Sequence, residues 1–139
     1  MSLSAEAQGG GPYVFDASSL INLERKDKEL SFLSGLGGRV FISQKVAEEV
    51  DEPRSGLSRW ISRNGGCIKS LLPEEDRLYR RFITQADLRI HDGEATALAI
   101  AFNRDGTLVI DDKVARRKAE SHGIPCVSLE GLLNQALIM

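Results

Sequence analysis

The sequence predicts an α/β fold, a three-layer α/β/α sandwich with a central, mostly parallel sheet. Two observations lead to this prediction. Short apolar runs alternate with segments of helical periodicity along most of the 139-residue chain, which is typical of strands buried on both faces by helices. No two apolar runs are joined by a hairpin turn signal, so helical crossovers must link the strands.

The strands are predicted where short apolar runs end at turn-forming or charged residues. The first of them ends at Asp16, and a later one ends at the pair Asp111-Asp112. The predicted strands span residues 13–15, 39–42, 67–69, 108–110 and 125–128.

The helices are predicted where apolar residues recur every three or four positions. Ser18 or Ser19 is the expected N-cap of the first helix, and Ser43 that of the third. The helix after Asp16 runs to about residue 25, and the others span 30–36, 44–52, 54–64, 73–86, 92–103, 113–121 and 129–138. Residues expected to face inward include Val46, Val50, Leu57, Trp60, Ile61, Leu78, Phe82, Ile83, Ala95, Leu98, Ala99, Phe102, Val114 and Ala115.

Composition places the chain among soluble globular proteins, with 42% hydrophobic and 27% charged residues. Residues 1–11 are small, polar and glycine-rich, and we expect a disordered tail rather than a signal peptide. Residues 12–139 then form one domain, with a cytoplasmic location as the default. No apolar run approaches the ~20 residues of a membrane span, so no membrane partner is expected. The net charge of −2 does not by itself indicate a nucleic-acid-binding protein.

Acidic residues recur where strands end and helices begin. Asp16 follows the first predicted strand, Glu94 stands in the first turn of a helix, and Asp111 and Asp112 follow the fourth strand. Glu49 lies beside the inward face of its helix. In a parallel sheet these positions share one edge, where ligands bind. Asp92, next to Glu94, is expected to cap its helix.

Carboxylates brought together in this way repel one another unless a cation offsets their charge. Mg²⁺ and Mn²⁺ prefer oxygen ligands, whereas zinc would call for converging His or Cys. Such an ion activates water and stabilises charge on a phosphate. The sequence therefore predicts phosphodiester or phosphoryl chemistry dependent on Mg²⁺ or Mn²⁺.

Other enzyme classes lack their motifs in this chain. There is no P-loop, no GxGxxG and no GxSxG, which argues against triphosphatase, dinucleotide-binding and serine-hydrolase functions. A haloacid-dehalogenase-type phosphoryl-transfer domain would need a second Asp two residues after Asp16, where Ser18 stands. A receiver domain would place its acidic pair after the first strand.

Three segments together resemble the PIN-domain family, the small nuclease fold of VapC-type toxins. VFDASSLINL resembles the opening of the family, VAEEV the segment with the second acid, and DGEATALAIA with LVIDDKVARRKA a prokaryotic subgroup. The resemblance extends from Tyr13 to the C-terminus and is weaker over residues 51–89. One departure is Ala17, where the family more often has Thr.

This resemblance implies a Mg²⁺- or Mn²⁺-dependent ribonuclease that hydrolyses RNA phosphodiester bonds. Asp16, Glu49, Glu94 and Asp112 would be its catalytic acids. Asp16, Glu94 and Asp112 would hold the metal, with Asp111 as the alternative to Asp112. Ser18 would be the hydrogen-bonding neighbour of Asp16.

Substrate and partners follow from the same resemblance. Lys113, Arg116 and Arg39 are the candidate contacts to substrate phosphates. The RNA substrate, a small antitoxin protein and a second copy in a homodimer are the expected partners. The alternative function is a catalytically inactive PIN-like module that binds RNA or protein, against which the four retained acids argue.

Overall fold

The computed structural model describes residues 11–85 and 90–138 of the chain. The tail predicted over residues 1–11 therefore lies almost wholly outside the described residues, as does the predicted helix end at residue 86. The strands are β1 (Tyr13–Phe15), β2 (Val40–Ser43), β3 (Ile68–Lys69), β4 (Thr107–Val109) and β5 (Cys126–Val127).

The helices alternate with these strands, as predicted. They are α2 (Ala17–Lys26), α3 (Ser31–Leu36), α4 (Gln44–Glu49), α5 (Gly56–Arg63), α6 (Pro73–Thr84), α7 (Asp92–Asn103), α8 (Lys113–Ser121) and α9 (Leu129–Ile138). Two short 3₁₀ turns, η1 (Gly37–Arg39) and η2 (Gly65–Cys67), lead into β2 and β3. No helix in the described parts of the chain is long and apolar enough to cross a membrane.

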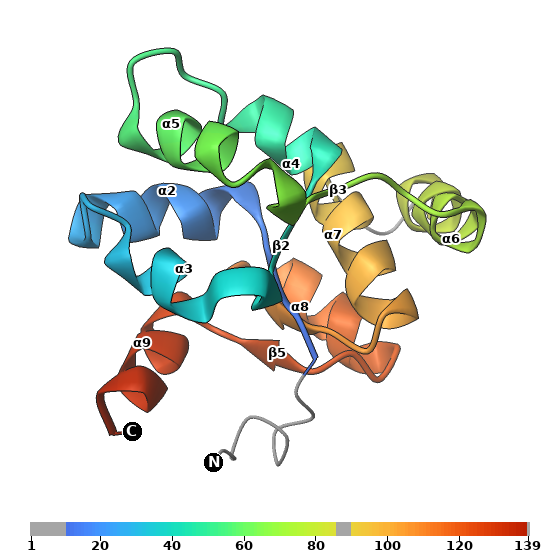
Figure 1. Cartoon of the computed structure of the whole chain (residues 1–139). Helices are drawn as coiled ribbons and strands as arrows, with labels where there is room; N and C mark the ends of the chain where they lie inside the picture. Colours follow the sequence, from blue (N-terminus) through green and yellow to red (C-terminus); the bar gives the residue numbers. More distant parts are fainter. Residues whose placement is uncertain (1–10, 86–89, 139) are drawn as a thin grey trace.

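The described strands form one parallel sheet in the order β3-β2-β1-β4-β5. β2 and then β3 lie on one side of β1. The chain then crosses back, and β4 and β5 lie on the other side of β1. Helices lie on both faces, with α2, α3 and α9 on one side of the sheet and α6, α7 and α8 on the other (Figure 1). The predicted three-layer α/β/α architecture is confirmed.

Alternating strand residues separate two apolar cores. In β1, Tyr13 and Phe15 pack with α2, α3, α5 and α9, while Val14 packs with α7 and α8. In β4, Leu108 and Val109 divide in the same way between the two cores. This two-residue period fixes the register, because a shift of one position would exchange every side chain between the two cores.

Several predicted details are wrong. Helix α4 ends at Glu49 rather than near Pro53, because Val50 already leaves the α-helical conformation. Ile83, Phe102 and Val114 were expected to face inward but are exposed. Phe102 and Val114 lie outside the buried faces of α7 and α8. Alanines on these faces, such as Ala99 and Ala115, make the contacts to the core instead.

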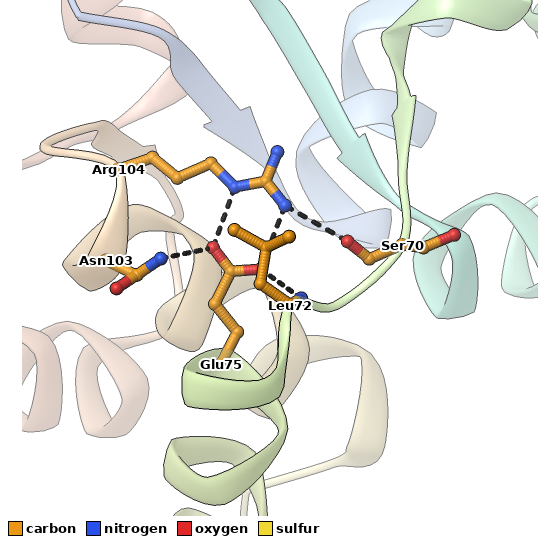
Figure 2. A network of polar contacts seen from close by, with 5 residues as sticks. All are labelled: Ser70, Leu72, Glu75, Asn103 and Arg104. Carbon is orange, nitrogen blue, oxygen red and sulfur yellow. Dashed lines mark hydrogen bonds and ion pairs between the residues drawn. The ribbon is translucent and has the colours of Figure 1, made fainter.

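One buried carboxylate joins α6 to the end of α7. Glu75 has no exposed surface. It accepts hydrogen bonds from Arg104 Nε at 2.7 Å, Arg104 Nη2 at 2.9 Å, Asn103 Nδ2 at 3.0 Å and the Leu72 backbone N–H at 2.8 Å (Figure 2). Arg104 also donates to the Ser70 carbonyl at 3.0 Å. Burial alone would raise the pKa of Glu75, but these hydrogen bonds lower it overall.

Candidate active site

The site lies at the topological switch point of the sheet, where the strands that follow β1 and those that follow β4 lie on opposite sides. β1 and β4 are neighbours in the sheet, yet their following connections lead to opposite sides, toward β2 and toward β5. Ligands of open α/β sheets bind at the carboxyl ends of such strands. Asp16 follows β1 directly, and Asp111 and Asp112 follow β4 after Ile110, so the fold brings these three acids to the same edge of the sheet.

Asp16 is held rigidly at the start of α2. It is 3% exposed, and its Oδ1 accepts a hydrogen bond from the Ser19 backbone N–H at 2.8 Å, which makes Asp16 the N-cap. The Ser19 hydroxyl donates to the Val109 carbonyl at 3.0 Å and so ties α2 to β4. The predictions that Ser18 or Ser19 caps this helix are therefore wrong. The hydrogen bond expected from Ser18 comes from Ser19, while Ser18 is exposed.

Glu94 stands in the first turn of α7 and faces the other acids. Its Oε1 accepts a hydrogen bond from the His91 backbone N–H at 3.2 Å. His91 rather than Asp92 is the N-cap residue, which corrects the role predicted for Asp92. Burial raises the pKa of Glu94 to about 7, and the negative charges of Asp112 and Asp16 add to the rise, although the His91 N–H acts against it.

The Asp pair divides its hydrogen bonds between two helices. Asp112 is the N-cap of α8, where its Oδ1 accepts from the Val114 backbone N–H at 3.0 Å. Asp111 Oδ1 accepts from the Leu129 backbone N–H at 3.2 Å, where α9 begins. Asp112 acts on Glu94 both through its charge and as a hydrogen-bond partner. Burial, and then the charges of Asp111 and Asp112, raise the pKa of Asp16 against the lowering effect of Ser19.

Glu49 reaches this edge through a gap left by a glycine. Its side chain lies against Gly93, where an added Cβ would overlap the Glu49 carboxylate. A side chain at position 93 would therefore displace the carboxylate of Glu49 from its present place. Gly93 thus leaves room for Glu49 beside the first turn of α7, and nothing in the sequence pattern marked it for that purpose.

The predicted phosphate contacts lie in different places. Lys113 is exposed at the start of α8, next to Asp112. Arg116 is half-buried and donates from Nη2 to the Ile110 carbonyl at 3.1 Å. Arg39 binds the Gly11 carbonyl at 3.0 Å and lies over the Tyr13 ring, at the opposite end of the strands. The expectation that Arg39 contacts substrate at this site is therefore wrong.

The carboxylates fit a hard divalent cation by their chemistry. All five are oxygen donors. Burial is the main cause of the raised pKa values of Glu94 and Asp16, and the charges of neighbouring acids, which a cation would offset, add to the rise. Within residues 11–85 and 90–138, however, no three Asp, Glu, His or Cys side chains stand close enough together to enclose an ion. Asp16, Asp111 and Asp112 instead accept hydrogen bonds from N–H groups at helix starts.

Comparison with known proteins places this geometry in context. A family model described as "PIN domain" matches residues 12–138. The crystal structure of PAE2754 from Pyrobaculum aerophilum is similar with a TM-score of 0.63 over 93% of this chain and 98% of that one, at 18% sequence identity. At that identity the likeness shows the fold. No curated protein sequence matches significantly.

Proposed function

The chain belongs to the PIN-domain family, and from this premise we propose that it is a Mg²⁺- or Mn²⁺-dependent nuclease that hydrolyses phosphodiester bonds in single-stranded RNA. PIN domains are generally nucleases. The proposal is best supported by the positions of Asp16 and Asp112, which follow the neighbouring strands β1 and β4 at the switch point. Burial raises the pKa of Glu94 to about 7, and the charges of these two acids add to the rise.

The proposed roles follow from where each acid stands. Asp16, Glu94 and Asp112 would hold the cation, and Glu49 would complete the negative pocket beside Gly93. When bound, the cation supplies an activated water and stabilises the charge of the phosphate. The hydrogen bond from Ser19 fixes the orientation of Asp16, so that this carboxylate loses little freedom when the site is filled. Lys113, which is exposed beside Asp112, would attract the substrate phosphate.

Cleavage of a labelled single-stranded RNA tests this function. We expect products in Mn²⁺ or Mg²⁺ and none in EDTA, with activity restored when the metal is returned in excess. Tight RNA binding without cleavage at any metal concentration would favour the alternative, a PIN-like module that binds without cutting. A protein that neither binds nor cuts RNA would contradict both.

Metal binding should depend on pH in a predictable direction. Glu94 is largely protonated below its pKa of about 7, and a proton there competes with the cation. We therefore expect the Kd for Mn²⁺ to fall as pH rises from 6 to 8, by up to about tenfold per pH unit per proton displaced. Isothermal titration calorimetry in two buffers of different ionisation enthalpy would count the released protons. A Kd that is constant over this range would contradict the placement of Glu94 among the ligands.

Separate substitution of Asp111 and of Asp112 should distinguish their roles. Each accepts a hydrogen bond at a helix start, so we expect Asp111→Ala and Asp112→Ala to lower stability by a similar amount, about 1 kcal/mol. Because Asp112 also acts on Glu94, we expect only Asp112→Ala to lower kcat, by about 100-fold. Urea unfolding and steady-state kinetics would measure the two effects. The reverse order of activities would assign the fourth acid to Asp111.

We also propose the partners that the family resemblance implies. The chain would act as the toxin of a toxin–antitoxin pair, be neutralised by a small antitoxin, and form a homodimer. A small neighbouring reading frame whose product forms a stable complex with the protein and inhibits it would support this role. Light scattering of the purified chain would measure its oligomeric state.

A further inference from the structure

A small cavity opens on one side of the acidic edge. It has a volume of about 240 Å³ and lies between the ends of β2 and β3 and helices α4, α6 and α7. Ser43 and Thr96 form part of its wall, and their hydroxyls are hydrogen-bonded at 2.8 Å. Thr96 also donates to the Gly93 carbonyl at 2.7 Å. Gly93 and Thr96 flank Glu94 in the first turns of α7, so the cavity lies beside the segment that carries this acid.

The cavity has an excess of positive charge. Lys45 and Lys69 line it together with one acid, Glu48. A second cavity of about 430 Å³ borders the cluster at Asp111 on the other side. There the two cations Arg25 and Lys26 are balanced by Asp111 and Glu130, so that this second cavity has no net charge. A polyanion that crosses the acidic edge is therefore attracted more strongly on the Lys45 side.

Two further cavities fit a polyanion less well. One of about 560 Å³ is lined by Glu48 and Asp51 without any Lys or Arg. The other, of about 470 Å³, also touches Lys69 but lies by the residues that lead into β2 at the amino side of the sheet. Of these four cavities, the one beside Ser43 thus combines positive charge with contact to the acidic edge.

The same cavity offers an aromatic wall. Tyr79 of α6 lines it and is only partly buried. Unpaired bases stack on such rings regardless of their sequence, because every base has a π-face. Lys69 is held in place by the Phe41 ring, whose centre lies 4.5 Å from its Nζ. An aromatic ring and two ammonium groups are the elements that single-strand-binding sites use for a base and its phosphate.

We propose that this cavity is a nucleotide subsite, which binds the residue of a single-stranded RNA next to the bond that is cut. The base lies against Tyr79, and Lys45 and Lys69 contact the adjacent phosphate. This proposal rests on the proposed function and names the part of the surface that selects an unpaired strand. A paired base has no free edge or face with which to enter a cavity of this size.

Neutralising the two lysines tests the subsite. For wild type, Lys45→Gln/Lys69→Gln and the control Arg25→Gln/Lys26→Gln, the Kd of a labelled ten-nucleotide single-stranded RNA is measured by fluorescence anisotropy over a range of salt. Loss of two phosphate contacts should reduce the slope of log Kd against log salt by about 1.4 and weaken binding at 0.1 M salt by about 25-fold. The control Arg25→Gln/Lys26→Gln removes two positive charges from the second cavity, which has no net charge in the wild type. It should leave both the slope and the Kd close to wild type. Lys45→Gln alone changes an exposed side chain and gives half the effect on the slope if the double variant does not fold.

The ring of Tyr79 provides a second measurement. Tyr79→Phe keeps the stacking surface and should bind like wild type, whereas Tyr79→Leu should weaken RNA binding by about tenfold or more. Equal effects of the two lysine and arginine pairs, or equal affinities of the Phe and Leu variants, would overturn the subsite. If wild type cuts RNA while these variants are unchanged, the subsite alone fails. If wild type neither binds nor cuts RNA, the proposed function fails with it.

Discussion

Glu94→Gln should abolish cleavage and at the same time stabilise the protein when no metal is present. The amide oxygen of Gln can still accept the hydrogen bond from the His91 N–H, so the first turn of α7 stays intact. The negative charge, however, is lost from the centre of the acidic cluster. We expect kcat for RNA cleavage to fall by about 1,000-fold, as measured by steady-state kinetics in Mn²⁺.

The gain in stability follows from the sign of the pKa shift. The pKa of Glu94 is about 7 in the folded protein and 4.5 in the reference state, so the folded chain binds more protons between these pH values. The wild type therefore loses stability as pH rises from 4.5 to 7, and the loss is complete above pH 7. After allowance for partial exposure, the variant should gain about 1 kcal/mol at pH 8, or about 3–5 °C in Tm.

A matched control is Glu74→Gln. Glu74 lies in the first turn of α6 and is exposed, so its neutralisation should change neither kcat nor the pH dependence of Tm. A Glu94→Gln protein that keeps wild-type activity would show that the acid at the start of α7 does not take part in the reaction. A Tm difference that does not grow between pH 5 and 8 would contradict the raised pKa of Glu94 in the folded protein.

Arg104→Ala should be the most destabilising of the substitutions considered. It leaves the Glu75 carboxylate, which has no exposed surface, without its charged partner (Figure 2). Removing one member of a buried ion pair costs about 3–5 kcal/mol, which corresponds to a fall in Tm of about 10–25 °C. Differential scanning calorimetry and urea unfolding at pH 7 would measure it.

The ion pair between Arg80 and Asp76, which lie on α6 together with Glu75, serves as the control. Its N···O distance is 2.9 Å, close to that of the buried pair, but the side chains are 71% and 43% exposed. We expect Arg80→Ala to leave Tm almost unchanged, because solvent screens such pairs. The pKa of Glu75 is lowered in the wild type. The difference in the free energy of unfolding between the wild type and Arg104→Ala should therefore shrink as pH falls below 4.5. Equal losses in the two arginine variants would contradict the role assigned to burial.

The strand and helix pattern could be predicted because it follows from local periodicity. Apolar runs such as residues 13–15 have no stable place except between two helical layers, and the acids that end them must lie at the carboxyl edge. The common edge of Asp16 and Asp112 could therefore be inferred. That β1 and β4 are neighbours, which places the two acids on adjacent strands, does not follow from periodicity and is seen only in the structure.

Other features depend on contacts between distant segments and have no local signal. Glu75 reads as an ordinary first-turn acid of α6, yet Arg104, almost thirty residues later, gives it a partner that allows burial. Gly93 reads as a poor helix residue, and only the approach of Glu49 explains it. Asp16 is the N-cap of α2, and the Ser19 hydroxyl binds instead the Val109 carbonyl, on a strand 90 residues away.

The central position of β1 also determines when the site can exist during synthesis. β1 leaves the ribosome long before its neighbour β4, which begins only at Thr107. Contacts of such long sequence separation form late, because the chain between them must be ordered first. A nascent chain that stops before Thr107 holds Asp16 and Glu94 but neither β4 nor Asp112. The acidic site is therefore completed only after β4 and Asp112 have been made, and products that stop earlier lack it.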